Sequence, residues 1–597
     1  MHATIKEYSE KITSRKSYWI PLLFYTFGAY GFSMLNRTVG ADDLATSLYV
    51  DGTVWLSELR WGAVLWKKLF SFGDCVPYLD KFLSVCFLML AGTAFACLLY
   101  TMNGRKDRVW LYTVAACSFI TYPIICEIWE FTCGGTIIVP GDFFCTFVLL
   151  LWLLHGQTDI RSGHSADTAD TADAGTHEKN DGQRYAKSAG KRPSGKYSSR
   201  IRGGSASGIP FLSDARKLLL AGILLTPVIS SAESIAPVYV TTVLIMLFYR
   251  HCVRRVRPGE KTAWFMEGVY YAIPLIIAFI LRLVIGYGIM AVLGLHYQHT
   301  GATRIEWPLS GAQLAGLFKG ILIDYGVAAL INLPITIFIV CTVLFAVRCI
   351  LLAVRRRSPL PLFLGICIGI SLFLITLIQG AVMYYRTAIT LMVFCAFVFY
   401  LFAEDFCRWI NDGILNRRRL QAALGRCGIV LLLFITWRQA AHLHRFLALN
   451  NQRYDNEAAV MQQIGYTLST EYDTSKPLIF VGDFSNGDAL YSITHDLGET
   501  RQGALYRRIR HRIDGTETWK SPALVQTTVS SAIDWYHWEF DGRLMGRFLA
   551  YYGYDFDVRA LSREELEPYN AEAAELGMKP FQIIDRGDYL LICLGRL

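Results

Sequence analysis

Residues 81–101 read KFLSVCFLMLAGTAFACLLYT, and this stretch decides the fold class of the chain. Its only charged residue is Lys81, at the very start. A helix needs about 20 consecutive apolar residues to cross the hydrocarbon core of a bilayer. The stretch therefore predicts a membrane-spanning helix, and similar runs recur along the chain on both sides of it.

The composition of the whole chain points the same way. Of 597 residues, 53% are hydrophobic and 14% aromatic, whereas only 18% are charged. Soluble domains carry roughly 25% charged residues, so a soluble chain of this length would need more surface charge. The composition excludes a fully soluble, a disordered and a fibrous protein. It indicates a polytopic membrane protein with some soluble mass.

Apolar runs of the required kind occur about eleven times. The predicted fold class is thus an all-α polytopic membrane protein with about eleven transmembrane helices. Residues 217–250 form the weakest pair, for which two short spans and one broken re-entrant pair both fit. The expected spans are residues 18–35, 81–101, 109–126, 135–155, 217–232, 235–250, 268–294, 328–353, 360–379, 386–403 and 426–441.

Lysine and arginine cluster beside the apolar runs, and their positions predict the orientation, because cytoplasmic loops carry an excess of both. Counting spans alternately from the basic N-terminus places all the clusters on one side, at residues 102–108, 156–216, 251–264, 354–359 and 404–425. We therefore expect a cytoplasmic N-terminus and an extracytoplasmic C-terminus. These loops account for the net charge of +9, so no nucleic acid is expected as a partner.

Two polar regions interrupt the helical pattern. Residues 156–214 include the repeat ADTADTAD and are rich in Ser, Gly and Lys, which predicts a disordered cytoplasmic linker. Residues 443–597 combine strand-like runs with helical periodicity, which predicts an extracytoplasmic α/β domain. The remaining parts are a cytoplasmic N-terminus at 1–17, helices 1–4 over 18–155 and helices 5–11 over 215–442.

The first outer loop, residues 36–80, carries two adjacent carboxylates, Asp42 and Asp43, just beyond the first span. Neighbouring carboxylates at a membrane surface repel each other and are costly to desolvate. Such a pair can supply a general base or bind a cation. A helix cap leading into the loop explains the pair equally well.

Other carboxylates emerge on the same expected face. Glu127 follows the third span about one turn after Pro123, and Glu233 lies in the short turn between the fifth and sixth spans. Either group can line a cavity shared with Asp42 and Asp43, and either can be an ordinary exposed acid.

Cations accompany these acids. Arg60 and Lys67 lie on an amphipathic helix of the first outer loop, and Arg386 follows Tyr385 at the mouth of the tenth span. The guanidinium fork matches phosphate oxygens, so these positions suit a phosphate-bearing substrate. The alternative is that they reach toward lipid headgroups. Hydroxyls and phosphate together are the features of a lipid-linked sugar.

The order of these residues resembles the bacterial Gtr type II glucosyltransferases, which belong to the type C glycosyltransferase superfamily. The likeness is strongest over residues 36–150. The tail and the insert at 156–214 have no clear counterpart in that pattern. The matching positions are Asp42, Asp43, Tyr49, Arg60, Trp61, Pro77 and Asp80, followed by Tyr122-Pro123 with Glu127 and by Tyr385-Arg386.

The resemblance implies an inverting transfer on the outer face of the bacterial plasma membrane. The donor would be a polyprenyl-phosphate sugar, with glucose expected, and the acceptor a hydroxyl of a surface glycan such as O-antigen. Asp42 or Asp43 would be the base, with Glu127 as a further catalytic candidate. The substrate-binding candidates are Arg60, Lys67, Arg386, Glu233 and Tyr385. No cofactor or metal site is required, although a divalent cation is compatible with the acids.

Other functions fit parts of the pattern. A surface-glycan polymerase or ligase would also have many spans and outer arginines, but it does not need paired acids directly after the first span. A transporter or flippase usually shows internal repeats and charges near the bilayer midplane. No repeat is evident here, and the charges lie at the span ends. A non-catalytic scaffold for glycan assembly is the remaining alternative.

Overall fold

The computed structural model is mostly helical, with one small sheet near the C-terminus. It describes residues 8–36, 38–40, 44, 52–70, 77–103, 108–130, 137–172, 215–254, 263–297, 309–327, 333–380, 387–412, 418–482, 501–515 and 543–595.

Each expected span overlaps helix within the described residues. Within the described residues, seven helical stretches are long and apolar enough to cross a membrane. They lie at residues 78–103, 138–155, 235–254, 263–293, 333–356, 390–408 and 420–471. The helices at the expected spans are α2 (Lys16–Leu35), α5 (Pro77–Asn103), α6 (Val109–Thr121), α8 (Ile138–Ala172), α9 (Ala215–Ile229), α10 (Ile235–Phe248), α11 (Ala263–Leu293), α13 (Leu333–Arg356), α14 (Leu360–Leu372) with α15 (Leu374–Gln379), α16 (Thr390–Asp412) and α17 (Arg418–Glu471).

Short helices join the long ones. Helix α6 ends before Pro123, because the residue that precedes a proline is pushed toward extended backbone, as Tyr122 is here. The short elements of the bundle are η1 (Ser9–Thr13), α3 (Thr53–Ser57), α4 (Trp61–Phe70), η3 (Pro123–Ile125), α7 (Cys126–Glu130), η4 (Tyr249–Arg254) and α12 (Gly311–Tyr325).

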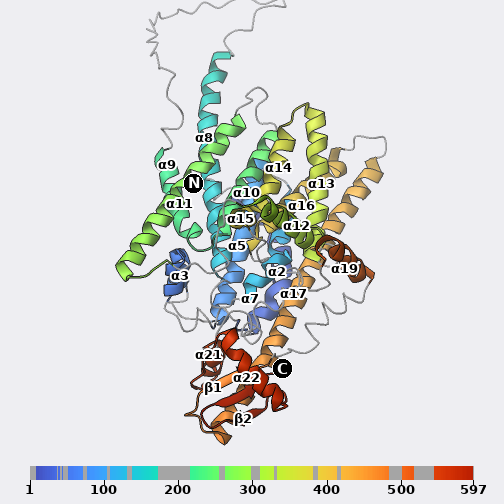
Figure 1. Cartoon of the computed structure of the whole chain (residues 1–597). Coiled ribbons are helices and arrows are strands. Elements are labelled where there is room, and N and C mark those ends of the chain that lie inside the picture. The colour runs from blue at the N-terminus through green and yellow to red at the C-terminus, as the bar shows by residue number, and fades with distance from the viewer. Residues whose placement is uncertain are drawn as a thin grey trace, which may run out of the picture.

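The long helices pack around one continuous apolar core. Helix α5 lies against α6 and α8, α16 lies against α6 and α17, and α11 lies against α9. Figure 1 shows the C-terminal domain at one end of this bundle, termed here the domain end. Helix α2 finishes there and α5 begins there, with α3 and α7 beside them, whereas α8 projects from the opposite end.

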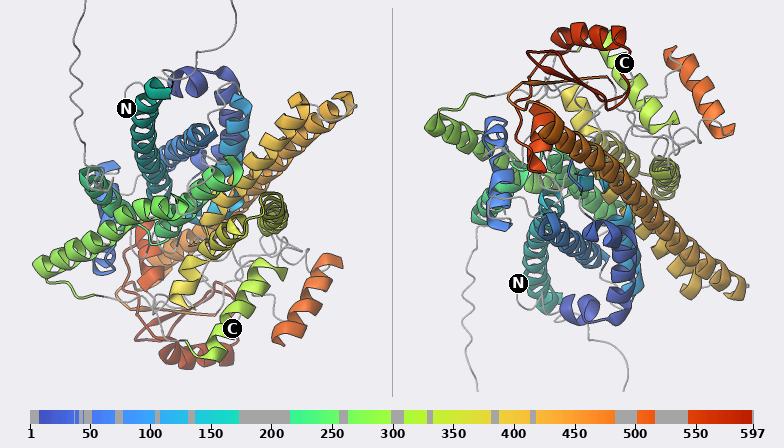
Figure 2. Two further views of the ribbon diagram at one scale, coloured as in Figure 1. Left: turned by 90° about the horizontal axis from the view of Figure 1, so that it is seen from above. Right: turned by 90° about the horizontal axis from the view of Figure 1, so that it is seen from below.

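Helix α17 links the bundle to the C-terminal domain. It is 54 residues long, or about 80 Å at the rise of an α-helix, far more than a bilayer core requires. Figure 2 shows it lying diagonally across the bundle. The sequence predicted a span at 426–441 that ends before a separate domain at 443–597. The structure joins them, because residues 442–453 contain neither proline nor glycine.

The expected linker also differs in part from the structure. Helix α8 continues to Ala172, beyond the predicted start of a disordered segment at residue 156. No proline interrupts residues 156–172, so nothing in this stretch forces the helix to end. Residues 173–214 lie outside the described residues.

The C-terminal domain contains a three-stranded sheet of order β1-β3-β2. Strand β1 (Leu478–Val481) runs parallel to β3 (Leu590–Cys593), and β2 (Ile583–Asp585) runs antiparallel to β3. The helices of this part of the chain are α19 (Arg501–Asp514), α21 (Arg543–Tyr551) and α22 (Arg563–Glu575). Its own apolar cluster includes Met461 from α17, Phe480 from β1 and Phe548 from α21, which makes it a second core.

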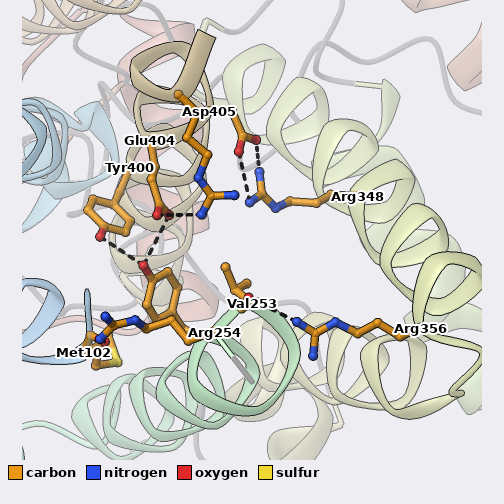
Figure 3. Close-up of polar contacts among 10 residues, drawn as sticks. Met102, Val253, Arg254, Arg348, Arg356, Tyr400, Glu404 and Asp405 are labelled. Atoms are coloured by element: carbon orange, nitrogen blue, oxygen red, sulfur yellow. Dashed lines mark hydrogen bonds and ion pairs between the residues drawn. The ribbon is translucent and has the colours of Figure 1, made fainter. Parts of the chain in front are cut away.

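A polar network ties the helices together at the opposite end of the bundle (Figure 3). Glu404 on α16 accepts hydrogen bonds from Arg408 at 2.8 Å and from the hydroxyl of Tyr249 at 3.2 Å. Arg254 donates to the carbonyl of Met102 at 2.6 Å, and Arg348 on α13 is ion-paired with Asp405. These bonds join α5, η4, α13 and α16, which indicates a structural role.

Candidate active site

A small cavity lined mainly by residues with polar groups lies between helices at the domain end. Its empty volume is about 200 Å³, including the part that is open to solvent. The walls come from α2, α5, α7 and α17, so segments far apart in sequence meet there. The lining residues are Ser33, Asn36, Thr38, Lys81, Trp129, Leu447, Asn450 and Asn451.

Lys81 is the cation of this cavity. Its side chain is only 2% exposed. The ammonium donates to the carbonyl of Asn36 at 2.8 Å and to the hydroxyl of Thr38 at 3.1 Å. A buried ammonium group is costly unless acceptors or anions surround it. Lys81 is therefore held by the segment that leads from α2 toward the acidic doublet.

Two asparagine amides on α17 form another part of the cavity wall. Asn450 and Asn451 on α17 are 2% and 8% exposed. The amide nitrogen of Asn451 donates to Asp455 at 2.9 Å, and its Oδ1 is buried with no hydrogen-bond partner among the described residues. Buried polar atoms of this kind are usually satisfied by protein, water or ligand. This wall can therefore accept a hydrogen bond from a hydroxyl group.

The acidic doublet itself, Asp42 and Asp43, lies outside the described residues. The residues that flank it are described. The amide of Leu44 donates to the carbonyl of Gly40 at 3.1 Å, which brings the two flanks together. Thr38, which precedes the doublet, lines the cavity. In the sequence, the doublet begins four residues after Thr38.

Glu127 belongs to helix α7, whose backbone lies at the same end of the bundle. Its side chain is outside the described part of the structure. Two residues later Trp129 lines the cavity, where its indole N–H donates to the hydroxyl of Ser33 at 2.9 Å. The ring of Trp129 also packs on Tyr30 with a centroid distance of 4.4 Å. Helix α7 is therefore locked against α2.

Arg60 lies away from the cavity wall, at the junction of α3 and α4. Its Nε donates to the carbonyl of Ser231 at 3.2 Å, and a terminal nitrogen is 3.6 Å from Glu58. Its guanidinium also lies 5.9 Å from the ring centre of Trp55. Arg60 is thus held by the turn between α9 and α10 as well as by its own helix pair.

Lys67 is buried on α4, with 7% of its surface exposed. Its ammonium lies 5.6 Å from the ring centre of Trp55, on which Arg60 also packs. Glu233 pairs with Arg282 of α11 at 3.0 Å. Burial raises the pKa of the Tyr297 phenol, and the charge of Glu233 adds to this rise. Glu233 and Tyr297 therefore belong to the group around α3, α9 and α11.

Helix α5 separates the two polar groups. Lys81 faces the cavity, whereas Leu83 and Phe87 pack in the cluster around Trp55 and Trp66. Residues two apart on a helix point in nearly opposite directions. The structure therefore does not place Arg60, Lys67 or Glu233 in the cavity wall. Arg386 and Tyr385 lie outside the described residues.

The structure identifies further polar residues that the sequence patterns did not single out. Lys81, Asn450 and Asn451 line the cavity, and Asp142 is fully buried near the start of α8. Asp142 accepts hydrogen bonds from Trp66 at 2.8 Å and from Ser231. A carboxylate within an apolar run is a signal in itself, because such groups are rare in membrane spans. The asparagine pair gives no comparable signal.

The described residues contain no group of three or more His, Cys, Asp or Glu side chains placed to hold a metal ion. A cation site that involves Asp42 and Asp43 would fall outside those residues. The described part of the cavity instead presents an ammonium, amides, hydroxyls and an indole, which are hydrogen-bonding groups for hydroxyl and phosphate oxygens.

Apolar helices long enough to cross a bilayer, together with a folded domain at one end, define a polytopic helical membrane protein. Comparison with known families indicates which kind of helical membrane protein this chain resembles. Residues 31–158 match the family described as glucosyl transferase GtrII, which confirms the resemblance inferred from the sequence and supports a membrane glucosyltransferase. No curated protein and no solved structure gives a significant match.

Proposed function

We propose that the chain transfers glucose from a polyprenyl-phosphate donor to a hydroxyl of a surface glycan, on the outer face of the bacterial plasma membrane. The observation that carries this proposal is the overlap between the family match and the cavity. The matched residues 31–158 supply Ser33, Asn36, Thr38, Lys81 and Trp129, the greater part of the cavity wall. The acidic doublet lies within the same matched segment.

The proposed reaction is a single inverting displacement. The acceptor oxygen attacks the anomeric carbon and forms the new glycosidic bond, while the bond from that carbon to the phosphate oxygen breaks. The electron pair of the broken bond leaves with polyprenyl phosphate. The hydroxyl proton passes to the carboxylate of Asp42 or Asp43, acting as general base.

Lys81 is the cation that we assign to the leaving phosphate. Fixed cations stabilise charge that develops on a leaving group. Lys81 is buried and bonded to residues 36 and 38, four to six residues before Asp42. Arg386 stays a candidate for the same task. Arg60 and Lys67 fit better as residues that fix α4 against its neighbours, given their contacts with Ser231 and Trp55.

The test is transfer of labelled glucose from polyprenyl-phosphate glucose in membranes that contain the full chain, with cell-envelope glycan as acceptor. We expect Asp42→Asn or Asp43→Asn to lower the rate about 100-fold or more, the usual contribution of a general base. The exposed Asp555 is a matched control, and Asp555→Asn should keep the full rate. Full activity in both doublet variants would overturn the base assignment.

Product analysis separates the alternatives. Mass analysis of surface glycan with and without the chain should show one added hexose per modified unit. A change in polymer length instead would favour a polymerase or ligase. An unchanged glycan with an altered distribution of lipid-linked sugar between leaflets would favour a flippase.

The proposed orientation has its own test. Protease added to sealed cells should cleave the C-terminal domain, which the proposal places outside. Cleavage that occurs only in inverted vesicles would contradict the orientation and, with it, an outer-face reaction.

A further inference from the structure

The residues that flank the acidic doublet are buried in the C-terminal domain. Val39 and Leu44 are 1% and 0% exposed. Both belong to the apolar cluster that contains Phe480 of β1 and Phe548 of α21, and not to the core of the helix bundle. The first loop of the family-matched segment is thus anchored, before and after Asp42-Asp43, in a domain more than 400 residues later in the chain.

A polar contact reinforces this anchor. Arg547 on α21 donates from its guanidinium to the carbonyl of Leu44 at 3.2 Å. Leu44 directly follows Asp43, so the contact brings a positive charge close to the doublet. Helix α21 is itself fixed by Leu544, Met545 and Phe548, which are all buried in the same cluster.

Helix α17 connects the same domain to the cavity. Asn450 and Asn451 line the cavity, and Tyr454, one turn later, belongs to the domain core. The hydroxyl of Tyr454 lies 2.8 Å from that of Tyr552, just beyond α21. One continuous helix therefore sets the cavity wall, and the domain on the same helix holds the loop that carries the acids.

We infer that the C-terminal domain holds the first outer loop on both sides of the acidic doublet, and that Arg547 is a positioning residue for the base proposed within that loop. This inference rests on the proposed function. Its physical basis is that a base must be held within a fraction of an ångström of its working place, and a displacement of about 1 Å can lower a rate on the order of 100-fold. The anchors at Val39 and Leu44 restrict how far the loop between them can move.

The first experiment measures the loop directly in the full-length protein. Hydrogen–deuterium exchange should become on the order of tenfold faster in peptides covering residues 38–44 when Arg547 is changed to Ala, because a local anchor is lost. Peptides from β1 and β3 should keep their wild-type exchange. Arg559→Ala is the matched control, since Arg559 lies over the ring of Tyr589 in the same domain. Leu44→Ala should reproduce the effect by removing the apolar anchor.

The second experiment measures how the rate of glucose transfer depends on pH, because that dependence reports the ionisation of the proposed base. Arg547→Ala should lower kcat on the order of tenfold and move the acidic limb of the profile upward by about half a pH unit, because a nearby cation favours an ionised carboxylate. Arg547→Lys should restore both rate and profile. Arg547→Gln keeps a donor without the charge, so it should restore much of the rate but not the profile. Partial unfolding would lower the maximal rate without shifting the acidic limb of the pH profile.

The outcomes distinguish the two proposals. Wild-type exchange in residues 38–44 together with a wild-type pH profile in Arg547→Ala would overturn the positioning role, even if Asp42 and Asp43 prove essential. Absence of transfer in the wild-type chain would instead overturn the proposed function, and the exchange measurement would still decide whether the domain holds the loop.

Discussion

The indole nitrogen of Trp66 donates to a carboxylate oxygen of Asp142 at 2.8 Å, and this bond fastens α4 to the start of α8. The ring of Trp66 also lies against Gly141, where a Cβ would come within 2.8 Å of it. The other carboxylate oxygen accepts from Ser231, in the turn between α9 and α10. A single buried acid therefore joins three parts of the domain end.

Asp142→Ala should destabilise the protein by about 1–3 kcal/mol, because it leaves the half-buried indole N–H of Trp66 without its acceptor. The lost bond to Trp66 should account for most of this change, because the hydroxyl of Ser231 has a second acceptor in the carbonyl of Val228 at 2.6 Å. Thermal unfolding of the purified protein in detergent measures it. Combining Asp142→Ala with Trp66→Phe should cost less than the sum of the single changes. If the losses of stability in the two single variants simply add in the double variant, the hydrogen bond between Trp66 and Asp142 does not contribute to stability.

Gly62→Ala should loosen the packing of α4 on α9. A Cβ at Gly62 would overlap the carbonyl oxygen of Pro227 and lie 2.8 Å from the amide nitrogen of Ser231, both of them backbone atoms. Overpacking of this kind costs about 1–3 kcal/mol. Gly288 on α11 is the control, because a Cβ there meets nothing within 4 Å. A lower Tm is expected for Gly62→Ala alone, and equal values would show that α4 can shift freely.

Lys81→Met should lower kcat for glucose transfer about 100- to 1,000-fold, the range seen when a donor to a developing anion is removed. Steady-state kinetics with polyprenyl-phosphate glucose measure it. Lys217→Met is a suitable control, because that ammonium packs over Trp152 on α8 and is not part of the cavity wall. Activity within a factor of about two of wild type would remove Lys81 from the leaving-group role.

Asp585→Asn should lower the Tm slightly at neutral pH. Hydrogen bonds from Lys476, and a further one from the amide of Gly587, hold the pKa of Asp585 below its usual value. A lowered pKa means that the contribution is fully present above the pKa of the unfolded chain, about 3.9, and is lost as pH falls through the folded value. The Tm difference should therefore vanish in acid. Unfolding curves from pH 7 downward measure it, with Asp555→Asn as control; a difference that persists in acid would contradict the ionic origin.

Sequence patterns located the helices well, because each apolar run forms its hydrogen bonds within itself. They did not predict the residues that line the cavity. Asp42, Asp43 and Glu127 stood out through their position after spans, and the family match includes all three. Arg60 and Lys67 stood out equally, yet the structure places them beside Trp55 on the other side of α5. Helical spacing shows which face a residue occupies but not which neighbour that face meets.

By itself, the sequence determined that this chain is a bundle of membrane helices with a mixed domain at its C-terminal end. Backbone groups in lipid must be satisfied within each segment, so local composition is enough for that conclusion. Only the tertiary structure decided that Asn36 and Asn450 share a cavity, and that Arg547 holds the carbonyl of Leu44. Such contacts join residues hundreds of positions apart, and they depend on how the packed helices and the C-terminal core bring those segments together.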